Sequence, residues 1–448
     1  MSTSYDPATA SSGTGQETGS RRRVVISTYI GTVIEWYDFY LYGAAAALVF
    51  NVLFFPEFSP LAGTLASFAT LGAGFLARPI GGIVWGHFGD RFGRKRMLVA
   101  SIVIMGVATT LVGLLPTYAQ IGVWAPVLLV SIRIVQGISA GGEWGGAALM
   151  ALEHAPTRRR GLWSSVAQVG VGSGIVLSTL VFSLFTRMPE GAFMSWGWRV
   201  PFLLAFPLVA LGLYIRLKVE ESPIFQEAQR RGEDRADEAG VPIVELLRHQ
   251  WRSVLIAIML VIGPFAASAV FITFGLSYAA QVGFDSTTAT GALVVAATVS
   301  VIGGILSAAA SDYLGRRPVF MTGAALLAVM SFVVFSAYNT GSTVLLFLGL
   351  SITYGTHSVM YGPLAAFLSE LFATTTRYTG ASVGYQVAGA LGGGFAPAIA
   401  VILLGAAGGP PNTLYVSLFM AACCAASFVA AYLSRETYRL DLTKVSKS

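Results

Sequence analysis

Charged residues are scarce in this sequence. Only 11% of its 448 residues are charged, whereas 55% are hydrophobic, and the mean hydropathy is +0.70. Soluble domains carry about 25% charged residues, so a soluble globular chain is excluded. Cysteine is almost absent as well. Cys423 and Cys424 are adjacent in an apolar stretch, which excludes a disulfide framework and favours packed or lipid-facing thiols over a metal site.

Several functional signatures are also missing. The sequence has no GxxxxGK[ST] pattern for a nucleotide phosphate, no cluster of metal ligands, and no nucleophile–base pattern. We therefore expect no enzyme activity, no cofactor and no metal, and an ion gradient rather than ATP as the energy source. No signal peptide is expected either, because the first apolar stretch is too long for one and no small-residue cleavage site follows it.

The most prominent feature of the sequence is a series of long apolar stretches. A bilayer span takes about 20 mostly apolar residues, and twelve such stretches are present. They lie near 24–50, 61–86, 97–115, 123–151, 162–186, 197–217, 253–280, 288–310, 318–338, 342–371, 379–405 and 412–434. Unpaired backbone groups are costly in lipid, so each span should be a helix. The sequence predicts an all-α polytopic membrane protein.

The formal charge of +6 is concentrated in alternate segments between the predicted spans. All but four of the 28 Lys and Arg residues lie in alternate connecting segments that include both termini, and the opposite loops hold only Arg187 and Arg199. The positive-inside rule places both termini in the cytoplasm. The basic charge therefore indicates orientation rather than a nucleic-acid partner. The remaining two cations, Arg78 and Arg133, lie inside spans.

One long hydrophilic stretch divides the chain into six spans and six spans. We predict a disordered tail at 1–23, a six-helix bundle at 24–217, a cytoplasmic linker at 218–252, a second bundle at 253–434 and a tail at 435–448.

The two halves repeat one design. GHFGDRFGRKRML after the second span corresponds to AAASDYLGRRPVF after the eighth, and a Glu followed seven residues later by an Arg comes after the fourth and tenth spans. Registered repeats of this kind indicate duplication. We expect charge-assisted bonds from these sets to close the cytoplasmic side. The sets are Asp90, Arg91, Gly93, Arg94, Glu153 and Arg160 in the first half, and Asp312, Gly315, Arg316, Glu370 and Arg377 in the second.

These motifs resemble a known family. GHFGDRFGRKRML is similar to the signature loop of the major facilitator superfamily, and RIVQGISAGG to its fourth-span arginine motif. IEWYDFYLYG, GGEWGGAAL, WGWRVPFL and YQVAGALGGGF resemble the metabolite:H⁺ symporters, above all the shikimate-type and related organic-acid porters. The resemblance covers the chain after its tail. It implies a major facilitator fold of two bundles around a central cavity that opens alternately to each side, working as a monomer in the cell membrane on a small molecule and protons.

The candidate functional residues are the ionisable residues inside the predicted spans. Even lenient insertion scales assign about 2.5–3.5 kcal/mol to a charge at the centre of a span, so these residues call for a function. Glu35 and Asp38 share a helix face, and the small residues Gly137, Gly141 and Gly142 would let a neighbouring helix approach closely. The candidate cavity residues are Glu35, Asp38, Tyr42, Arg78, Arg133, Gln136 and Glu143, with Tyr385 and Gln386 from the second half.

Two interpretations of these charges compete. The structural one is a buried ion pair, for example Arg133 with Glu143 or with Asp38. The functional one is proton coupling, with Asp38 as first proton acceptor, Arg133 as a switch that holds an anionic substrate, and Glu35 or Glu143 as a relay. In the second half, His357 is either a titrating group or a hydrogen-bonded packing residue.

The favoured function is proton-coupled import of a small organic acid such as shikimate, a dicarboxylate or 2-oxoglutarate. The fifth span lacks the Gly-Pro pattern of the drug/H⁺ antiporters that the chain resembles, which favours symport. An alternative is import of proline or betaine, since four aromatic residues of the first span could surround a quaternary ammonium, namely Trp36, Tyr37, Tyr40 and Tyr42. Against it, osmosensing relatives carry a long C-terminal coiled coil, whereas about fourteen residues follow Ser434 here. A non-transporting membrane sensor is the third possibility.

Overall fold

The structure, a computed structural model, describes residues 8–92, 94–153, 155–217, 246, 248, 250–372 and 377–439. Most of the linker predicted at 218–252 and the end of the tail predicted at 435–448 lie outside these residues. Within the described ranges the regular structure is helical, without strands. The prediction of an all-α chain is confirmed.

Six spans form the first half. They are α1 (Ala8–Ala45) with η1 (Ala46–Phe50) and α2 (Asn51–Leu53); α3 (Pro60–Phe92); α4 (Arg94–Leu114); α6 (Trp124–Ala140) with α7 (Glu143–Glu153); α8 (Arg160–Thr186); and η3 (Gly197–Arg199) with α10 (Val200–Leu203) and α11 (Ala205–Leu217). The short helices α5 (Tyr118–Ile121), η2 (Thr157–Arg159) and α9 (Glu190–Ser195) lie in the connections.

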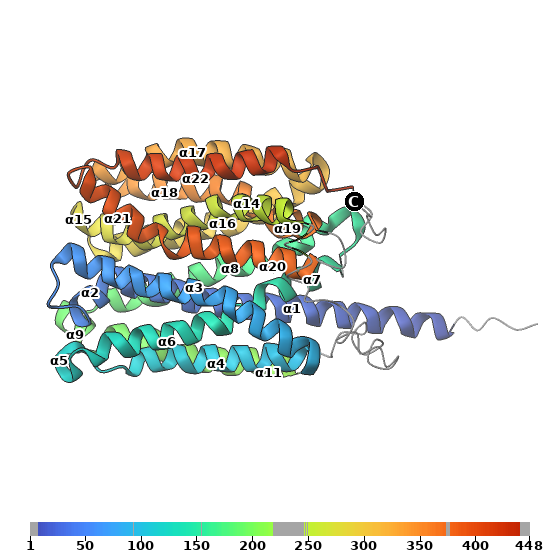
Figure 1. The fold of residues 1–448 in the computed structure, drawn as a ribbon, viewed down its shortest axis with the longest axis horizontal. Helices are drawn as coiled ribbons and strands as arrows, with labels where there is room; N and C mark the ends of the chain where they lie inside the picture. Colours follow the sequence, from blue (N-terminus) through green and yellow to red (C-terminus); the bar gives the residue numbers. More distant parts are fainter. Residues whose placement is uncertain are drawn as a thin grey trace, which may run out of the picture.

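Six further spans form the second half. They are α14 (Trp251–Ala269) with η4 (Val270–Phe274) and α15 (Gly275–Gln281); α16 (Ser286–Leu314); α17 (Arg316–Asn339); α18 (Thr343–Tyr361) with α19 (Leu364–Glu370); α20 (Arg377–Ala388) with η5 (Gly389–Gly394) and α21 (Ala396–Ala406); and α22 (Leu414–Leu433). In Figure 1 the helices of the two halves form two groups that lie side by side with roughly parallel axes.

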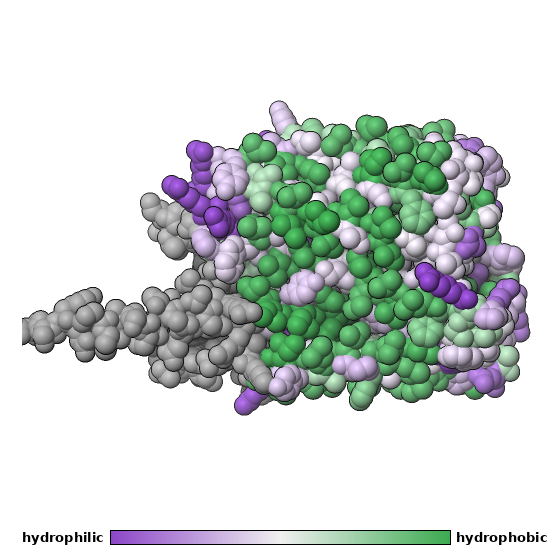
Figure 2. Space-filling view, turned by 180° about the vertical axis from the view of Figure 1, so that it is seen from behind, coloured by the Kyte–Doolittle hydropathy of each residue, from purple (hydrophilic) through white to green (hydrophobic). Residues whose placement is uncertain are grey.

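The lengths and surfaces of these helices suit a bilayer. Ten described helices are long and apolar enough to cross a membrane, and Val99–Leu114 is a shorter apolar helix. At about 1.5 Å per residue, α16 is about 43 Å long, more than the roughly 30 Å hydrocarbon core. Phe206 and Leu306 are among many exposed large apolar side chains. Figure 2 shows a broad hydrophobic band between two more hydrophilic ends.

The first helix begins earlier than the sequence predicts. The first span was expected at 24–50 after a disordered tail, yet α1 starts at Ala8 and projects beyond the bundle in Figure 1. Nucleation is the costly step of helix formation, whereas each added residue needs only propagation. A membrane span that is already helical therefore extends into the polar residues before it.

The two halves meet along two pairs of spans. On one side α8 packs against α16, and on the other α3 packs against α20, η5 and α21. The first and seventh spans also touch, through α1 with η4 and η1 with η4. Both η1 and η4 are wide π-helical turns at equivalent places in the two halves, and such turns are frequent at functional sites. The two halves are therefore in contact through the second, fifth, eighth and eleventh spans and through the first and seventh.

Candidate functional site

A close crossing of α3 and α6 positions the charged centre. A Cβ atom added to Gly137 would lie 2.0 Å from the carbonyl oxygen of Gly74, and one added to Gly141 would lie 2.1 Å from that of Arg78. Real Cβ atoms do not approach oxygen so closely, so only glycine allows these two backbones to touch. The predicted close approach at Gly137 and Gly141 is confirmed. It brings the arginine of each helix to the same buried layer.

Asp38 lies at the middle of a hydrogen-bonded network. Its Oδ1 accepts from Thr109 Oγ1 at 2.5 Å and from Gln136 Nε2 at 2.8 Å, while Oδ2 lies 3.3 Å from Arg133 Nη1. Arg133 also donates to Gln136 Oε1 at 3.0 Å. Of the two partners considered for Arg133, the structure selects Asp38. All four side chains are buried.

Aromatic rings hold the guanidinium of Arg133 in place. It lies 4.3 Å from the ring centre of Tyr42 and 5.4 Å from that of Phe39, both within range of cation–π attraction. The Tyr42 hydroxyl is 2.6 Å from Thr70 Oγ1, which fixes the ring. Arg133 Nε has no hydrogen-bond partner among the described residues, so part of its donor capacity is unused.

Glu35 and Arg78 form a looser pair. Glu35 Oε1 and Arg78 Nη1 are 3.5 Å apart, and neither atom has a hydrogen-bond partner within the described part of the chain. The Arg78 guanidinium instead rests against aromatic rings, 4.7 Å from the centre of Phe75 and 5.5 Å from that of Trp36. A buried arginine with an unused N–H is suited to receive an anionic ligand.

Glu143 does not join this layer as expected. Glu143 was predicted to line the cavity with Arg133 and Gln136, but the helix is interrupted between α6 and α7 at Gly141 and Gly142. Glu143 instead pairs with Arg216 of α11. A Cβ atom on Gly31 would lie 2.5 Å from Arg216 Nη2, so this glycine makes room for the pair.

Arg216 is a site residue that the sequence analysis missed. It was counted among the cytoplasmic charges because it stands near the end of its span, yet it is buried. Its apolar neighbours in LGLYIRL were the available signal. The buried centre of the first half therefore holds three acids and three arginines. Glu35 lies within electrostatic range of both Glu143 and Arg216, which links the three pairs.

A small pocket opens among these charges. It is lined by Glu35, Asp38, Gly74, Arg78, Met105, Arg133, Gln136, Gly137 and Ala140. Five of the predicted cavity residues thus share one pocket inside the first half, between α1, α3, α4 and α6. Thr109, which also binds Asp38, was not predicted, because a lone threonine in an apolar span gives no distinguishing signal.

Tyr385 and Gln386 reach this centre from the second half. Gln386 Nε2 donates to the Gly141 carbonyl at 3.0 Å, and the Tyr385 ring stacks on Trp144 with ring centres 3.6 Å apart. The Tyr385 hydroxyl lies 3.3 Å from that of Tyr361. Both predicted residues therefore lie at the contact between the halves. His357 is buried one helical turn before Tyr361, and its Nε2 lies 3.2 Å from the Pro264 carbonyl oxygen and 3.1 Å from Ser268 Oγ.

The second-half charge set closes one end of the interface. Asp312 accepts from the Gly161 and Leu162 amides at 2.8 and 3.0 Å, so a carboxylate of α16 caps the first turn of α8 in the other half. Arg316 Nη1 donates to Asp312 at 2.8 Å, and its Nε lies 3.3 Å from Glu370 Oε2. Unpaired amides and the helix dipole both favour a negative charge at this position.

The surrounding residues complete this network. Gly315 has φ +102°, which L-residues rarely adopt, and it allows the sharp turn between α16 and α17. Arg160 is buried and lies close enough to act electrostatically on Glu370, and Arg377 is buried as well. Glu436 accepts from the amides of Arg316 and Arg317, a contact the sequence analysis missed.

Most of the charge set predicted for the cytoplasmic side of the first half lies outside the part of the chain that the structure describes. Gly93 lies outside the described residues, as do the side chains of Asp90, Arg91, Arg94 and Glu153. Their predicted role stays a prediction.

Two bundles of apolar helices, with three ion pairs buried at the centre of the first, define the class of the molecule, a multi-pass membrane transporter. The family described as "Sugar (and other) transporter" matches residues 24–447. The shikimate transporter of Escherichia coli K12 is 40% identical over 93% of this chain and 95% of its own length. The proline/betaine transporter of the same strain is 34% identical over 86% and 78%, respectively.

The solved structure of the E. coli xylose transporter XylE in a partially occluded inward-open conformation superposes with a TM-score of 0.73. The likeness covers 94% of this chain and 99% of that one at 20% identity, so it shows the fold alone. The chain belongs to the sugar (and other) transporter family of the major facilitator superfamily, within its metabolite:H⁺ symporters. The twelve-helix major facilitator fold predicted from the sequence is confirmed.

Proposed function

We propose that the chain imports a small organic acid together with protons. The observation that carries this proposal is the buried network in which Asp38 occupies Arg133. A substrate carboxylate and Asp38 compete for the same guanidinium, because each is the natural partner of a planar two-pronged cation. Protonation of Asp38 removes its negative charge and frees Arg133 for the substrate. Proton binding and anion binding thereby favour each other.

The charge balance of the centre supports the same coupling. Three acids and three arginines form buried pairs at the centre of the first half, Glu35–Arg78, Asp38–Arg133 and Glu143–Arg216. An added monoanion would leave one uncompensated negative charge at a depth where charge is costly. One bound proton restores neutrality. We therefore infer a stoichiometry of one proton per monoanionic substrate.

The contact between Asp312 and α8 supplies the conformational part of the proposal. It joins the two halves through charge-assisted bonds to the Gly161 and Leu162 amides, and these must break before the halves can separate at that end. We assign that end to the cytoplasm from the distribution of Lys and Arg, with both termini on the same side. The unit is a monomer in the cell membrane.

Import of betaine or proline is the competing function, and one observation speaks against it. Two of the four rings predicted to surround a quaternary ammonium already face a cation, because the Arg78 guanidinium lies over Trp36 and the Arg133 guanidinium lies over Tyr42. A second cation placed there would meet like charge.

The deciding experiment is uptake by proteoliposomes that contain the purified full chain. Labelled shikimate, 2-oxoglutarate, succinate, proline and betaine are offered under an inward proton gradient and again without it. Accumulation of an acid only under the gradient is the expected result. Uptake should also rise as the external pH falls from 7 to about 5.5, because protonation of the buried acids favours binding of the anion. Transport of betaine or proline alone would show the proposal to be wrong.

A further inference from the structure

The three buried ion pairs of the first half lie at successive depths along its axis. Two of the acids are on α1, where Glu35 is about 4.5 Å nearer the beginning of the helix than Asp38, at about 1.5 Å per residue. Gly31 is about 6 Å nearer still. A Cβ atom added to Gly31 would lie 3.1 Å from Glu143 Oε1, so the third acid lies beside this glycine. The acids therefore lead from Asp38 toward the end of the bundle where α1 begins.

The other helices of the first half show the same order. Glu143 follows Arg133 by ten residues, which places it roughly 15 Å further along the fourth span. Its partner Arg216 is the next-to-last residue of α11 (Ala205–Leu217). The fourth and sixth spans both run toward the end at which α1 begins. The pair of Glu143 and Arg216 is therefore the one nearest the end that we assign to the cytoplasm.

Both glutamates of this series keep a free carboxylate oxygen. Glu35 Oε1 and Glu143 Oε2 have no hydrogen-bond partner among the described residues, although the two side chains are only 2% and 1% exposed. Buried polar atoms in native proteins are nearly always hydrogen-bonded. Each of these oxygens can take up a proton without giving up a hydrogen bond. Glu35 lies within electrostatic range of both Asp38 and Glu143, so it is the middle member of the series.

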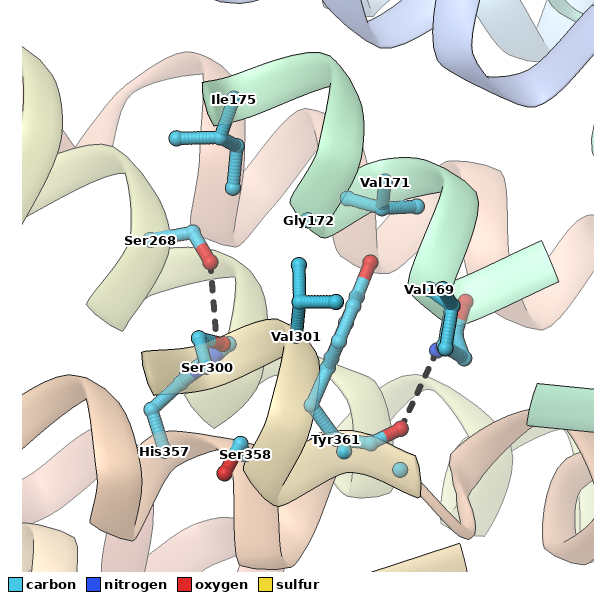
Figure 3. A pocket seen from close by; sticks show the side chains of 13 residues that line it. Val169, Val171, Gly172, Ile175, Ser268, Ser300, Val301, His357, Ser358 and Tyr361 are labelled. Atoms are coloured by element: carbon cyan, nitrogen blue, oxygen red, sulfur yellow. Dashed lines mark hydrogen bonds between the residues drawn. The ribbon is translucent and has the colours of Figure 1, made fainter. Parts of the chain in front are cut away.

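The contact between the halves offers no comparable series. A pocket lies there between α8 of the first half and α14, α16 and α18 of the second (Figure 3). None of the 13 described residues that line it is Asp, Glu, Lys or Arg. Its histidine, His357, is held through Nε2 by the Pro264 carbonyl oxygen and Ser268 Oγ. A proton that left through this pocket would meet no carboxylate to receive it.

We propose that the proton leaves through the interior of the first half, passing from Asp38 to Glu35 and then to Glu143, which releases it to the cytoplasm beside Arg216. The inference rests on the proposed function, in which Asp38 takes up the proton. Each step breaks an O–H bond on one carboxyl group and forms one on the next, directly or through one water. The arginine paired with each acid balances the charge that the departing proton leaves behind, since an unpaired buried charge is costly. The proton and the substrate then leave by different routes.

Replacement of Glu143 by Gln tests this route in proteoliposomes. The side chain keeps its size and can still accept from Arg216, but it cannot carry a proton. Counterflow of labelled substrate needs only binding and conformational exchange, so it should keep its native rate. The initial rate of net uptake under an inward proton gradient should fall at least about tenfold, because a positioned proton-transfer group contributes at least this much. Uptake should stay uphill although slow, since coupling at Asp38 is intact.

Two further variants complete the experiment. Glu143→Asp retains a carboxyl group and should restore most of the net uptake. Glu190→Gln is the control, because Glu190 is an exposed acid in a connection between spans, and it should change neither rate. The double variant Glu143→Gln/Arg216→Gln removes both charges of the pair. It should show the same difference between counterflow and net uptake, and it keeps the test valid if Glu143→Gln alone fails to fold around an unpaired arginine.

The outcomes separate the possibilities. Net uptake at the native rate by Glu143→Gln or by the double variant would show that the proton leaves elsewhere, and it would overturn the inference. An equal loss of counterflow and net uptake would overturn it as well, because the pair would then only support the structure. If the unaltered protein showed no gradient-driven uptake of any acid, the proposed function itself would be wrong.

Discussion

Replacement of Asp38 by Asn is the most direct test of coupling. The variant keeps the size of the side chain, and its Oδ1 can still accept from Thr109 and Gln136, which lie 2.5 and 2.8 Å from Oδ1 of the native residue. The group that faces Arg133 Nη1 at 3.3 Å becomes an amide NH₂, so two donors oppose each other. Arg133 is then permanently free to hold a substrate carboxylate, whatever the pH.

The expected loss can be calculated from the proposed stoichiometry. One proton per monoanion is electroneutral, so the driving force is the pH difference alone, about 1.4 kcal/mol per unit. A difference of two units should therefore sustain an accumulation of about 100-fold in the native protein. In Asp38→Asn the internal concentration should only reach the external one, because the protonation that makes uptake uphill has been removed.

Proteoliposomes loaded with unlabelled substrate provide the second measurement. Counterflow needs only binding and conformational exchange, so it should stay detectable in Asp38→Asn. Glu190→Gln is the control, since Glu190 is an exposed acid in a connecting loop and its loss should change neither quantity. Accumulation of about 100-fold by Asp38→Asn would refute the assignment and move the proton to Glu35 or Glu143.

Three further substitutions test other parts of the molecule. Arg133→Lys keeps the charge but loses the planar grip on a carboxylate, so we expect KM for the acid to rise at least about tenfold; an unchanged KM would contradict the switch. Asp312→Asn should slow transport while leaving equilibrium affinity the same, because its bonds to Gly161 and Leu162 lie away from the pocket; weaker binding at an unchanged rate would argue against a gate. Gly137→Ala must push the Gly74 backbone away, so thermal stability in detergent should fall, and an unaffected melting temperature would disprove the close crossing.

The sequence predicted the fold because its signals are long and repeated. Each span is specified by about 20 apolar residues, and substitution of a few of them would not hide it. The start of α1 was placed too late, since helix ends depend on propagation into polar residues that carry no hydropathy signal. Boundaries of this kind are the least certain part of any assignment from one sequence.

The sequence predicted most of the residues of the candidate site, but it did not predict which acid pairs with which arginine. Glu35 and Asp38 share a helix face, as their spacing requires, yet they pair with arginines of different helices, Arg78 of α3 and Arg133 of α6. Helical periodicity gives the direction of a side chain but not the identity of the neighbouring helix. Arg216 was missed for a related reason, because an arginine near the end of a span is indistinguishable from a topology charge until its partner, Glu143, is located.

The positions of the buried charges suggest different roles for the two halves. Within the described residues, the three ion pairs at the centre of the molecule belong to the first half, whereas no Asp, Glu, Lys or Arg lines the pocket that α8 forms with α14, α16 and α18 of the second half. The second half can therefore move relative to the first without separating any of these buried charges, a step that would cost several kcal/mol in a medium of low dielectric constant. The charged contact that must break is the one at the membrane edge, between Asp312 and α8, where water can solvate the released carboxylate. This arrangement lets protonation control substrate binding inside one bundle while the movement between bundles stays energetically accessible.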